Sequence, residues 1–176
     1  MPTTTRRRFV DMRVADLVKA PAPAPADCYI VLLEEHGDRR RRLLVWIGGT
    51  EAISMALRLA GMGRPARPLG ADLSAGLVGA LGGRLAEVRI DRLEEGTFYA
   101  TVAVDGPRGP AEVDARPSDA LNLALAAGVP VRVDGTVLEQ AAAEVDRLEV
   151  ELPPLPPPGG EGAPGARAIV EELAGG

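Results

Sequence analysis

Residues 113–131 read VDARPSDALNLALAAGVPV, and they predict a strand end, a complete helix and the start of another strand. Arg116 marks the strand's last position, because a residue that precedes proline is disfavoured from the helical region. Pro117 suits the first position of a helix, and the carboxylate of Asp119 stabilises the positive end of the helix dipole. Gly128 then ends the helix. Charged side chains are therefore concentrated at one strand-to-helix corner.

The same corner occurs a second time, earlier in the chain. Residues 50–57 (TEAISMAL) align without gaps with residues 118–125 (SDALNLAL), each with a hydroxyl residue, an acid, an alanine and equal apolar spacing. Glycine-containing turns predict a hairpin before each copy. These hairpins pair residues 29–33 with 43–47, and residues 98–104 with 110–115. We therefore expect an α+β fold with a repeated strand–strand–helix unit and a mixed or antiparallel sheet packed by helices, the alternative being a chance likeness of two short helices.

Length and charge narrow the classes of protein to which the chain can belong. A chain of 176 residues is expected to form one domain, and its hydrophobic content of 46% allows a sizeable core. The net charge of −5 argues against a protein that holds nucleic acid by bulk electrostatics, since such domains are usually basic. Any contact with nucleic acid is therefore expected to be local.

The single cysteine and the lack of a recognisable signal peptide favour a cytoplasmic protein without a membrane partner. The chain has a single cysteine, so no disulfide can form within it, which is typical of a reducing compartment. The first ten residues, MPTTTRRRFV, carry positive charge without the apolar run of a signal peptide, and no segment is long and apolar enough to span a bilayer.

Composition also predicts which segments of the chain are folded and which are not. Residues 1–7 are expected to be a flexible N-terminus, residues 8–148 the folded domain, and residues 149–176 a disordered tail rich in proline and glycine. The proline run in that tail suits a spacer or a ligand for a protein partner. Within the domain, Trp46 is predicted to fill the core, and Asp72 is predicted to cap a helix over residues 73–81.

Four motifs occur in an order and spacing that resemble the bifunctional nuclease family. They are WIGGTEAISMAL (residues 46–57), RPARPLGADL (64–73), EEGTFYATV (94–102) and DARPSDALNLAL (114–125). The resemblance covers about residues 9–145. It implies an α+β domain, a homodimer, and a nuclease that acts on both RNA and DNA.

The resemblance also implies where the site lies, at Glu51, Arg67, Asp72, Arg116, Ser118 and Asp119. The carboxylates of Glu51, Asp72 and Asp119 are the candidate catalytic groups, and they could bind Mg²⁺ or Mn²⁺. Arg67 and Arg116, with Ser118, are the candidate substrate-binding residues, since arginine binds phosphate in a bidentate manner.

One departure from the family's pattern concerns the residues just before Asp72. Family members commonly carry a Thr-His pair there, and this chain has Gly70 and Ala71. If that histidine serves as a base or ligand in active relatives, this chain lacks it. His36 is the only histidine, and it lies elsewhere in the sequence.

Two functions from different classes therefore remain open. The first is a metal-assisted nuclease that hydrolyses RNA or DNA. The second is a non-catalytic dimeric module that binds an anion, nucleic acid or a protein through the same corner. The second is compatible with a purely structural role for the acids, because a carboxylate at a helix N-terminus stabilises by about 0.3–1 kcal/mol without any catalysis.

Overall fold

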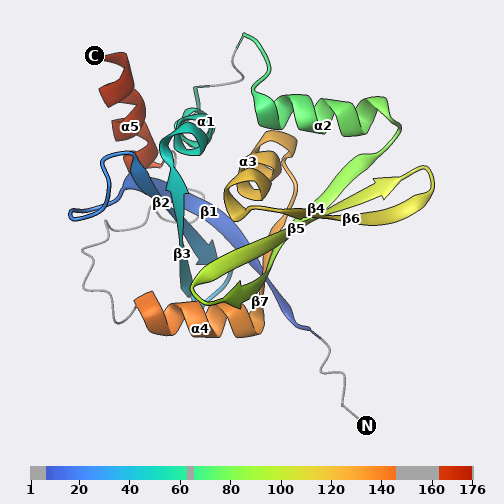
Figure 1. Cartoon of the computed structure of the whole chain (residues 1–176), viewed down its shortest axis with the longest axis horizontal. Coiled ribbons are helices and arrows are strands. Elements are labelled where there is room, and N and C mark those ends of the chain that lie inside the picture. Colours follow the sequence, from blue (N-terminus) through green and yellow to red (C-terminus); the bar gives the residue numbers. More distant parts are fainter. Residues whose placement is uncertain (1–6, 63–65, 146–162, 176) are drawn as a thin grey trace.

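Two three-stranded antiparallel meanders, each followed by a helix, form most of the structure (Figure 1). The computed structural model describes residues 7–62, 66–145 and 163–175. The strands in this part are β1 (Phe9–Lys19), β2 (Cys28–Glu35), β3 (Arg42–Gly48), β4 (Arg84–Glu94), β5 (Thr97–Gly106), β6 (Gly109–Ala115) and β7 (Val131–Asp134). The helices are α1 (Gly49–Leu59), α2 (Gly70–Ala80), α3 (Pro117–Ala127), α4 (Gly135–Val145) and α5 (Pro164–Ala174).

The strand order is mirrored about β7. The sheet runs β3-β2-β1-β7-β4-β5-β6, so that each meander lies on one side of the short central strand. The sheet is mixed, because β7 pairs antiparallel with β1 and parallel with β4. The repeated unit predicted from the sequence is β2–β3–α1 and β5–β6–α3, and the predicted α+β fold is confirmed.

The sheet is strongly curved, and the main core lies on one of its faces. Helix α4 packs against β3, β7 and β4, although β3 and β4 are not neighbours in the sheet. Figure 1 shows α1 and α3 together at one end of the sheet and α4 across the other end. One continuous cluster of buried side chains joins these helices to the strands, with Leu33, Met55, Ile90, Leu121 and Leu138 among its fully buried members.

The prediction that Trp46 fills the core is wrong. Its side chain is 45% exposed, whereas its strand neighbours Val45 and Ile47 are buried in the main cluster. Successive side chains of a strand point to opposite faces of the sheet. The aliphatic neighbours take the inward face, so that Trp46 is left on the outer one.

The expectation of a disordered tail over residues 149–176 needs correction at its C-terminal end. Residues 164–174 form α5, which packs against α1 and β1. Its inward face consists of Ala166, Ile169 and Val170, all of them buried. A helix of this length is only marginally stable in isolation, and burial of its apolar face provides the additional stability. Residues 149–162 lie outside the described residues, as do residues 1–6 of the predicted flexible N-terminus.

A buried aspartate fixes the start of α5. The side chain of Asp16 accepts hydrogen bonds from the backbone N–H groups of Gly165 (2.9 Å) and Ala166 (3.0 Å). These N–H groups have no partner within the helix, so the carboxylate satisfies them and complements the helix dipole. The β1–β2 register shifts between Val14 and Asp16, and this bulge occurs where the carboxylate meets α5.

Candidate functional site

The charged corner identified in the sequence is a three-residue cluster of Glu51, Arg116 and Asp119, called the corner triad below. Arg116 is the N-cap residue of α3 and has extended backbone angles, as expected for a residue before proline. Its Nε and Nη2 atoms donate to the two carboxylate oxygens of Asp119, at 2.7 and 3.1 Å. Nη2 also donates to Oε1 of Glu51 at 2.8 Å. One guanidinium group thus joins the first turns of α1 and α3.

The two acids of the corner triad occupy equivalent positions in the repeated unit. Glu51 is the acid of the TEAISMAL copy, and Asp119 is the acid of the SDALNLAL copy. Helices α1 and α3 pack against each other. The two carboxylates converge because both bond to the same Nη2 atom. The repeat therefore brings together two acids that are far apart in the sequence.

Electrostatically, the corner triad is permanently charged and open to solvent. Asp119 first, and then Glu51, raise the pKa of Arg116 above its ordinary value through hydrogen bonds and charge. The Arg116 side chain is 67% exposed, so a ligand can reach it. Two carboxylates face a single guanidinium group, which leaves the corner triad with an excess of negative charge.

Asn122 is a member of this region that the sequence reasoning did not identify. Its side-chain Nδ2 donates to the backbone carbonyl oxygens of Glu51 (3.1 Å) and Ser118 (3.2 Å), so it also ties α1 to α3. The repeat could have identified Asn122, because the equivalent position of the first copy, Ser54, is also polar although the neighbouring positions are apolar. Ser118, an expected substrate-binding residue, is itself buried.

Two cavities flank the corner triad, and both are lined by Glu51, Ala115 and Arg116. The larger one, of about 700 Å³, lies between the first turns of α1, α2 and α3 and the strands β4 to β6, and is called the corner cavity below. Its lining is largely aliphatic, with Val78, Leu85, Val102, Val104, Val113 and Leu123 among the contributing residues. The smaller one, of about 480 Å³, lies where the edge strand β3 approaches the start of β5 and the end of β6.

The third predicted acid, Asp72, has a different role from that of the corner triad. Its Oδ2 accepts hydrogen bonds from Arg58 Nη2 and from the backbone N–H of Leu69, both at 2.9 Å. Asp72 thus stabilises the first turn of α2, which begins at Gly70 and is three residues longer at its start than predicted. It does not contribute to the lining of either cavity beside the corner triad.

The other residues expected near Asp72 divide between the surface and the corner cavity. Arg67 is exposed, and in the part of the chain that the structure describes it lines neither cavity. Gly70 and Ala71, at the positions where the resemblance implies Thr-His, do line the corner cavity. A Cβ atom on Gly70 would meet no other atom within 4 Å. The two small residues therefore leave this side of the cavity open.

The expected three-carboxylate metal site is not assembled in residues 7–62, 66–145 and 163–175, where no three His, Cys, Asp or Glu side chains are grouped to hold an ion. The donor set at the corner triad is smaller, consisting of Glu51 and Asp119, whose carboxylates both bond to Nη2 of Arg116. Two carboxylates still suit Mg²⁺, which commonly takes one or two protein carboxylates together with water and substrate phosphates.

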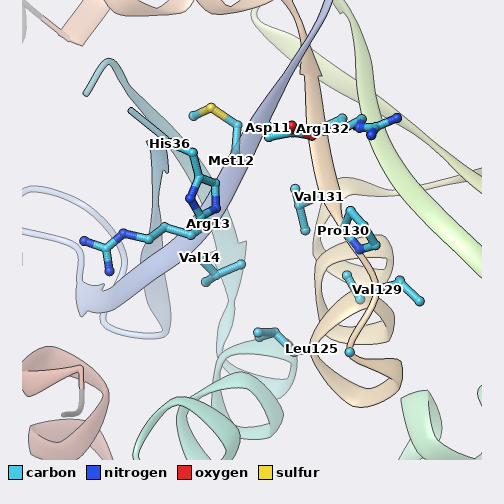
Figure 2. A pocket seen from close by; sticks show the side chains of 12 residues that line it. Asp11, Met12, Arg13, Val14, His36, Leu125, Val129, Pro130, Val131 and Arg132 are labelled. Atoms are coloured by element: carbon cyan, nitrogen blue, oxygen red, sulfur yellow. Dashed lines mark hydrogen bonds and ion pairs between the residues drawn. The ribbon is translucent and has the colours of Figure 1, made fainter. Parts of the chain in front are cut away.

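His36 does not replace the missing histidine. Figure 2 shows its ring beside Arg13, in a separate cavity of about 660 Å³ formed by β1, the α3–β7 connection and the last turns of α3. The corner triad lies at the opposite end of α3, a helix of 11 residues and therefore about 16 Å long. Within the described residues, the structure also contains no helix long and apolar enough to cross a membrane.

Comparison with known proteins agrees with the resemblance drawn from the motifs. The family described as "Bifunctional nuclease domain" matches residues 30–146. Two relatives come from Mycobacterium tuberculosis, "Uncharacterized protein MT1877" of strain CDC 1551 / Oshkosh and "Uncharacterized protein Rv1829" of strain H37Rv. Each is 44% identical over 132 residues, which cover 74% of this chain and 75% of the relative. The matched region contains the second copy of the repeated unit, the first copy from Ile30 onward and the whole corner triad, and the chain belongs to the bifunctional nuclease domain family.

Proposed function

We propose that this protein is a nuclease that hydrolyses phosphodiester bonds of RNA or DNA at the corner triad. The observation that carries the proposal is an exposed arginine, held between two carboxylates that come from equivalent positions of a repeat, at the mouth of a cavity. Membership of a family described as a nuclease domain supports it. The acidic net charge implies that binding depends on local contacts rather than on a basic surface.

Arg116 is the group that would bind the scissile phosphate. A guanidinium group presents paired N–H donors that match two phosphate oxygens, and it stabilises the charge that develops on them as water attacks. Arg116 now directs these donors at Asp119 and Glu51. A bound phosphate would share them, so the acids hold the guanidinium in place until substrate arrives.

Glu51 is the better candidate for the general base. Both oxygens of Asp119 accept hydrogen bonds from Arg116, whereas only Oε1 of Glu51 does so. Among the described residues, Oε2 of Glu51 accepts no hydrogen bond, which leaves it able to take a proton from the attacking water. The water oxygen then bonds to phosphorus, the bond from phosphorus to the leaving sugar oxygen breaks, and that oxygen gains a proton from solvent.

A divalent cation fits this arrangement as a partner of the substrate. Glu51 and Asp119 would hold Mg²⁺ or Mn²⁺, and Asp72, engaged with Arg58, would not. Such an ion supplies positive charge to the phosphate oxygens and lowers the pKa of a bound water. A bound cation would also offset the excess negative charge of the corner triad, which would otherwise repel a phosphodiester.

We also propose that the protein acts as a homodimer that assembles through α2. This helix has no buried residue of its own, and three leucines spaced four residues apart are exposed, two on the helix and one at the residue that caps its C-terminus. Leu73 is 56% exposed, Leu77 55% and Leu81 78%. A helical stripe of this kind is normally covered, and a second copy of the chain would cover it in both protomers at once.

The test is cleavage of labelled RNA and single-stranded DNA by the purified full chain in Mg²⁺, Mn²⁺ and EDTA. An Arg116→Ala/Asp119→Asn variant removes two members of the corner triad. The matched control is Arg84→Ala/Asp105→Asn, which removes another exposed Arg–Asp pair that lies at the far end of the β4–β5 ladder. We expect metal-dependent cleavage by the wild type and by the control, and its loss in the corner variant.

Two outcomes would contradict the proposal. Equal cleavage by all three preparations would assign the activity to a contaminant or to another site. Binding of nucleic acid by the folded wild type without cleavage in either metal would favour the non-catalytic binding module instead.

A further inference from the structure

The smaller of the two cavities beside the corner triad contains most of the chain's aromatic side chains. The whole sequence has one tryptophan, two tyrosines and two phenylalanines, yet Trp46, Phe98 and Tyr99 all line this cavity. Its volume is about 480 Å³, and it is called the aromatic cleft below. The chemistry proposed for the corner triad does not use these rings, so their concentration beside it points to a further role.

The aromatic cleft lies between two free strand edges. Among the described strands, β3 is at one end of the sheet and pairs only with β2. Strand β6 ends at Ala115, opposite Ala100, so residues 97–99 of β5 pair only with β4. Four consecutive residues of β3, 45–48, line the aromatic cleft, as expected for a cleft that follows a strand edge and not one face of the sheet. The cleft is therefore open to an extended ligand.

Trp46 is the aromatic residue of the cleft that is most available to a ligand. It is 45% exposed, and among the described residues its indole makes neither a hydrogen bond nor a contact with another ring or a cation. Tyr99, by contrast, lies under Arg92, whose Cζ is 4.3 Å from the ring centroid, and Phe98 packs against the main core. The exposed indole leaves a flat apolar surface in water, which a flat ligand would cover.

Charge limits what can lie against Trp46. Arg116 lines the aromatic cleft as well as the corner cavity, so a phosphate bound to it would lie beside the cleft. The other charged side chains of the cleft are the carboxylates of Glu51 and Asp114, which would repel an anion placed deeper. The ligand therefore needs an uncharged flat group next to a phosphate, and a nucleotide has both.

We infer that the aromatic cleft binds one unpaired nucleobase, stacked on the indole of Trp46, while Arg116 binds the adjacent phosphate. Stacking tolerates every base, because each has a π face, so this contact adds affinity without sequence preference. It gives an acidic protein a means of holding nucleic acid that does not depend on a basic surface. The inference rests on the proposed nuclease function and specifies how the substrate is held beside the bond that is cleaved.

The competing occupant is a peptide. An extended peptide could pair its backbone with the free edge of β3, as in other cases of strand addition. Such a ligand would bind mainly through main-chain hydrogen bonds, which do not require the ring of Trp46. The aromatic lining and the guanidinium group of Arg116 favour the nucleotide, and the experiment below distinguishes the two.

The experiment measures binding, so that it is independent of cleavage. Trp46 is the only tryptophan of the chain, and the tryptophan emission of the full-length protein therefore reports on the aromatic cleft alone. The protein is titrated in Mg²⁺ with hexathymidylate whose phosphorothioate linkages resist hydrolysis, and with an abasic phosphorothioate strand of the same length and charge. Anisotropy of labelled strands gives the affinities. We expect hexathymidylate to quench the emission and to bind about tenfold more tightly than the abasic strand, which should leave the emission largely unchanged.

Three variants separate stacking from the phosphate contact. Trp46→Leu keeps an apolar side chain but removes the ring, so we expect about tenfold weaker binding of hexathymidylate and unchanged binding of the abasic strand. Trp46→Phe keeps a ring and should retain most of the preference for hexathymidylate. Arg116→Ala should weaken the binding of both strands equally. Leu173→Ala, at an exposed leucine of α5, is the matched control and should behave like the wild type.

The outcomes distinguish this inference from the proposed function. Unchanged emission with hexathymidylate, equal affinity for the abasic strand, or a preference that persists in a folded Trp46→Leu variant would overturn the base site and leave the aromatic cleft to a peptide. The corner triad could still cleave nucleic acid in that case. Quenching and preference without cleavage of RNA or DNA would uphold the base site and contradict the nuclease function.

Discussion

Glu51 and Arg116 are separated by 65 positions in the sequence and are joined by a hydrogen bond of 2.8 Å from Nη2 to Oε1. This bond connects the two copies of the repeated unit at the point where each helix begins. It brings the acid of the first copy to the arginine that precedes the second. The chemistry of the site follows from this contact, because the corner of the first copy has an acid but no arginine, and Arg116 bonds to an acid of each copy.

Replacement of Arg116 by lysine separates its charge from its geometry. Lysine keeps the positive charge but lacks the planar paired donors, so we expect Arg116→Lys to lower kcat/KM for RNA about tenfold and Arg116→Ala to lower it further. The free energy of unfolding should hardly change in either variant, since an exposed ion pair contributes little to stability. Steady-state cleavage and urea unfolding check the two parts, and equal activity of lysine and arginine would contradict bidentate binding.

Introducing before Asp72 the Thr-His pair that the resemblance implies tests the effect of its replacement by Gly70 and Ala71. In the variant Gly70→Thr/Ala71→His an imidazole would stand at the corner cavity, and the space beside Gly70 accommodates a side chain. Histidine exchanges protons near neutral pH, so we expect cleavage to rise by about a hundredfold. Gly70→Thr alone is the control. A folded double variant that cleaves no faster than this control would show that this chain does not need the pair.

Asp72 is expected to affect stability rather than chemistry. Asp72→Asn weakens the hydrogen bonds to Arg58 and to the backbone of Leu69, which should lower the free energy of unfolding by about 2 kcal/mol. Specific activity per folded molecule should remain close to that of the wild type. Asp119→Asn is the comparison, for which we expect lower specific activity and an almost unchanged free energy of unfolding. A folded Asp72→Asn protein without activity would restore Asp72 as a catalytic or metal-binding residue.

The docking of α5 depends on a glycine. A Cβ atom at Gly165 would lie 2.5 Å from the backbone oxygen of Leu17, so Gly165→Ala must displace the start of the helix from Asp16. We expect a loss of about 1–3 kcal/mol in the free energy of unfolding and faster hydrogen exchange throughout α5. Gly175→Ala is the control, since its nearest atom is 3.4 Å away. Unchanged exchange in α5 would contradict this account.

The proposed homodimer can be tested at its leucine stripe. Leu73→Glu/Leu77→Glu places two charges on the exposed face of α2, which would be buried against a second copy, so we expect a monomer in sedimentation equilibrium. Leu173→Glu, at an exposed leucine of α5, should remain dimeric. A monomeric wild type, or a dimer that persists in the double variant, would rule out this interface.

The local parts of the fold were predictable because they depend on neighbouring residues. Pro117 and Gly128 bound α3, and period-two alternation together with glycine turns identifies both hairpins. The repeat itself, from Thr50 and from Ser118, was visible by alignment alone. The Arg116–Asp119 contact is also local, since residues three positions apart meet at the start of a helix.

Long-range relationships were decided only by the tertiary structure. Asp119 and Asp72 are both acids near helix starts, yet one meets Arg116 and the other meets Arg58, because packing rather than local sequence determines which arginine lies within reach. The burial of α5 depends in the same way on Asp16, which is 149 positions away from Gly165. By itself the sequence determined the repeat, the family and the elements other than α5. Which side chains meet, which cavity they surround and which polar atom is left without a partner followed from the way the two meanders curve around a common core.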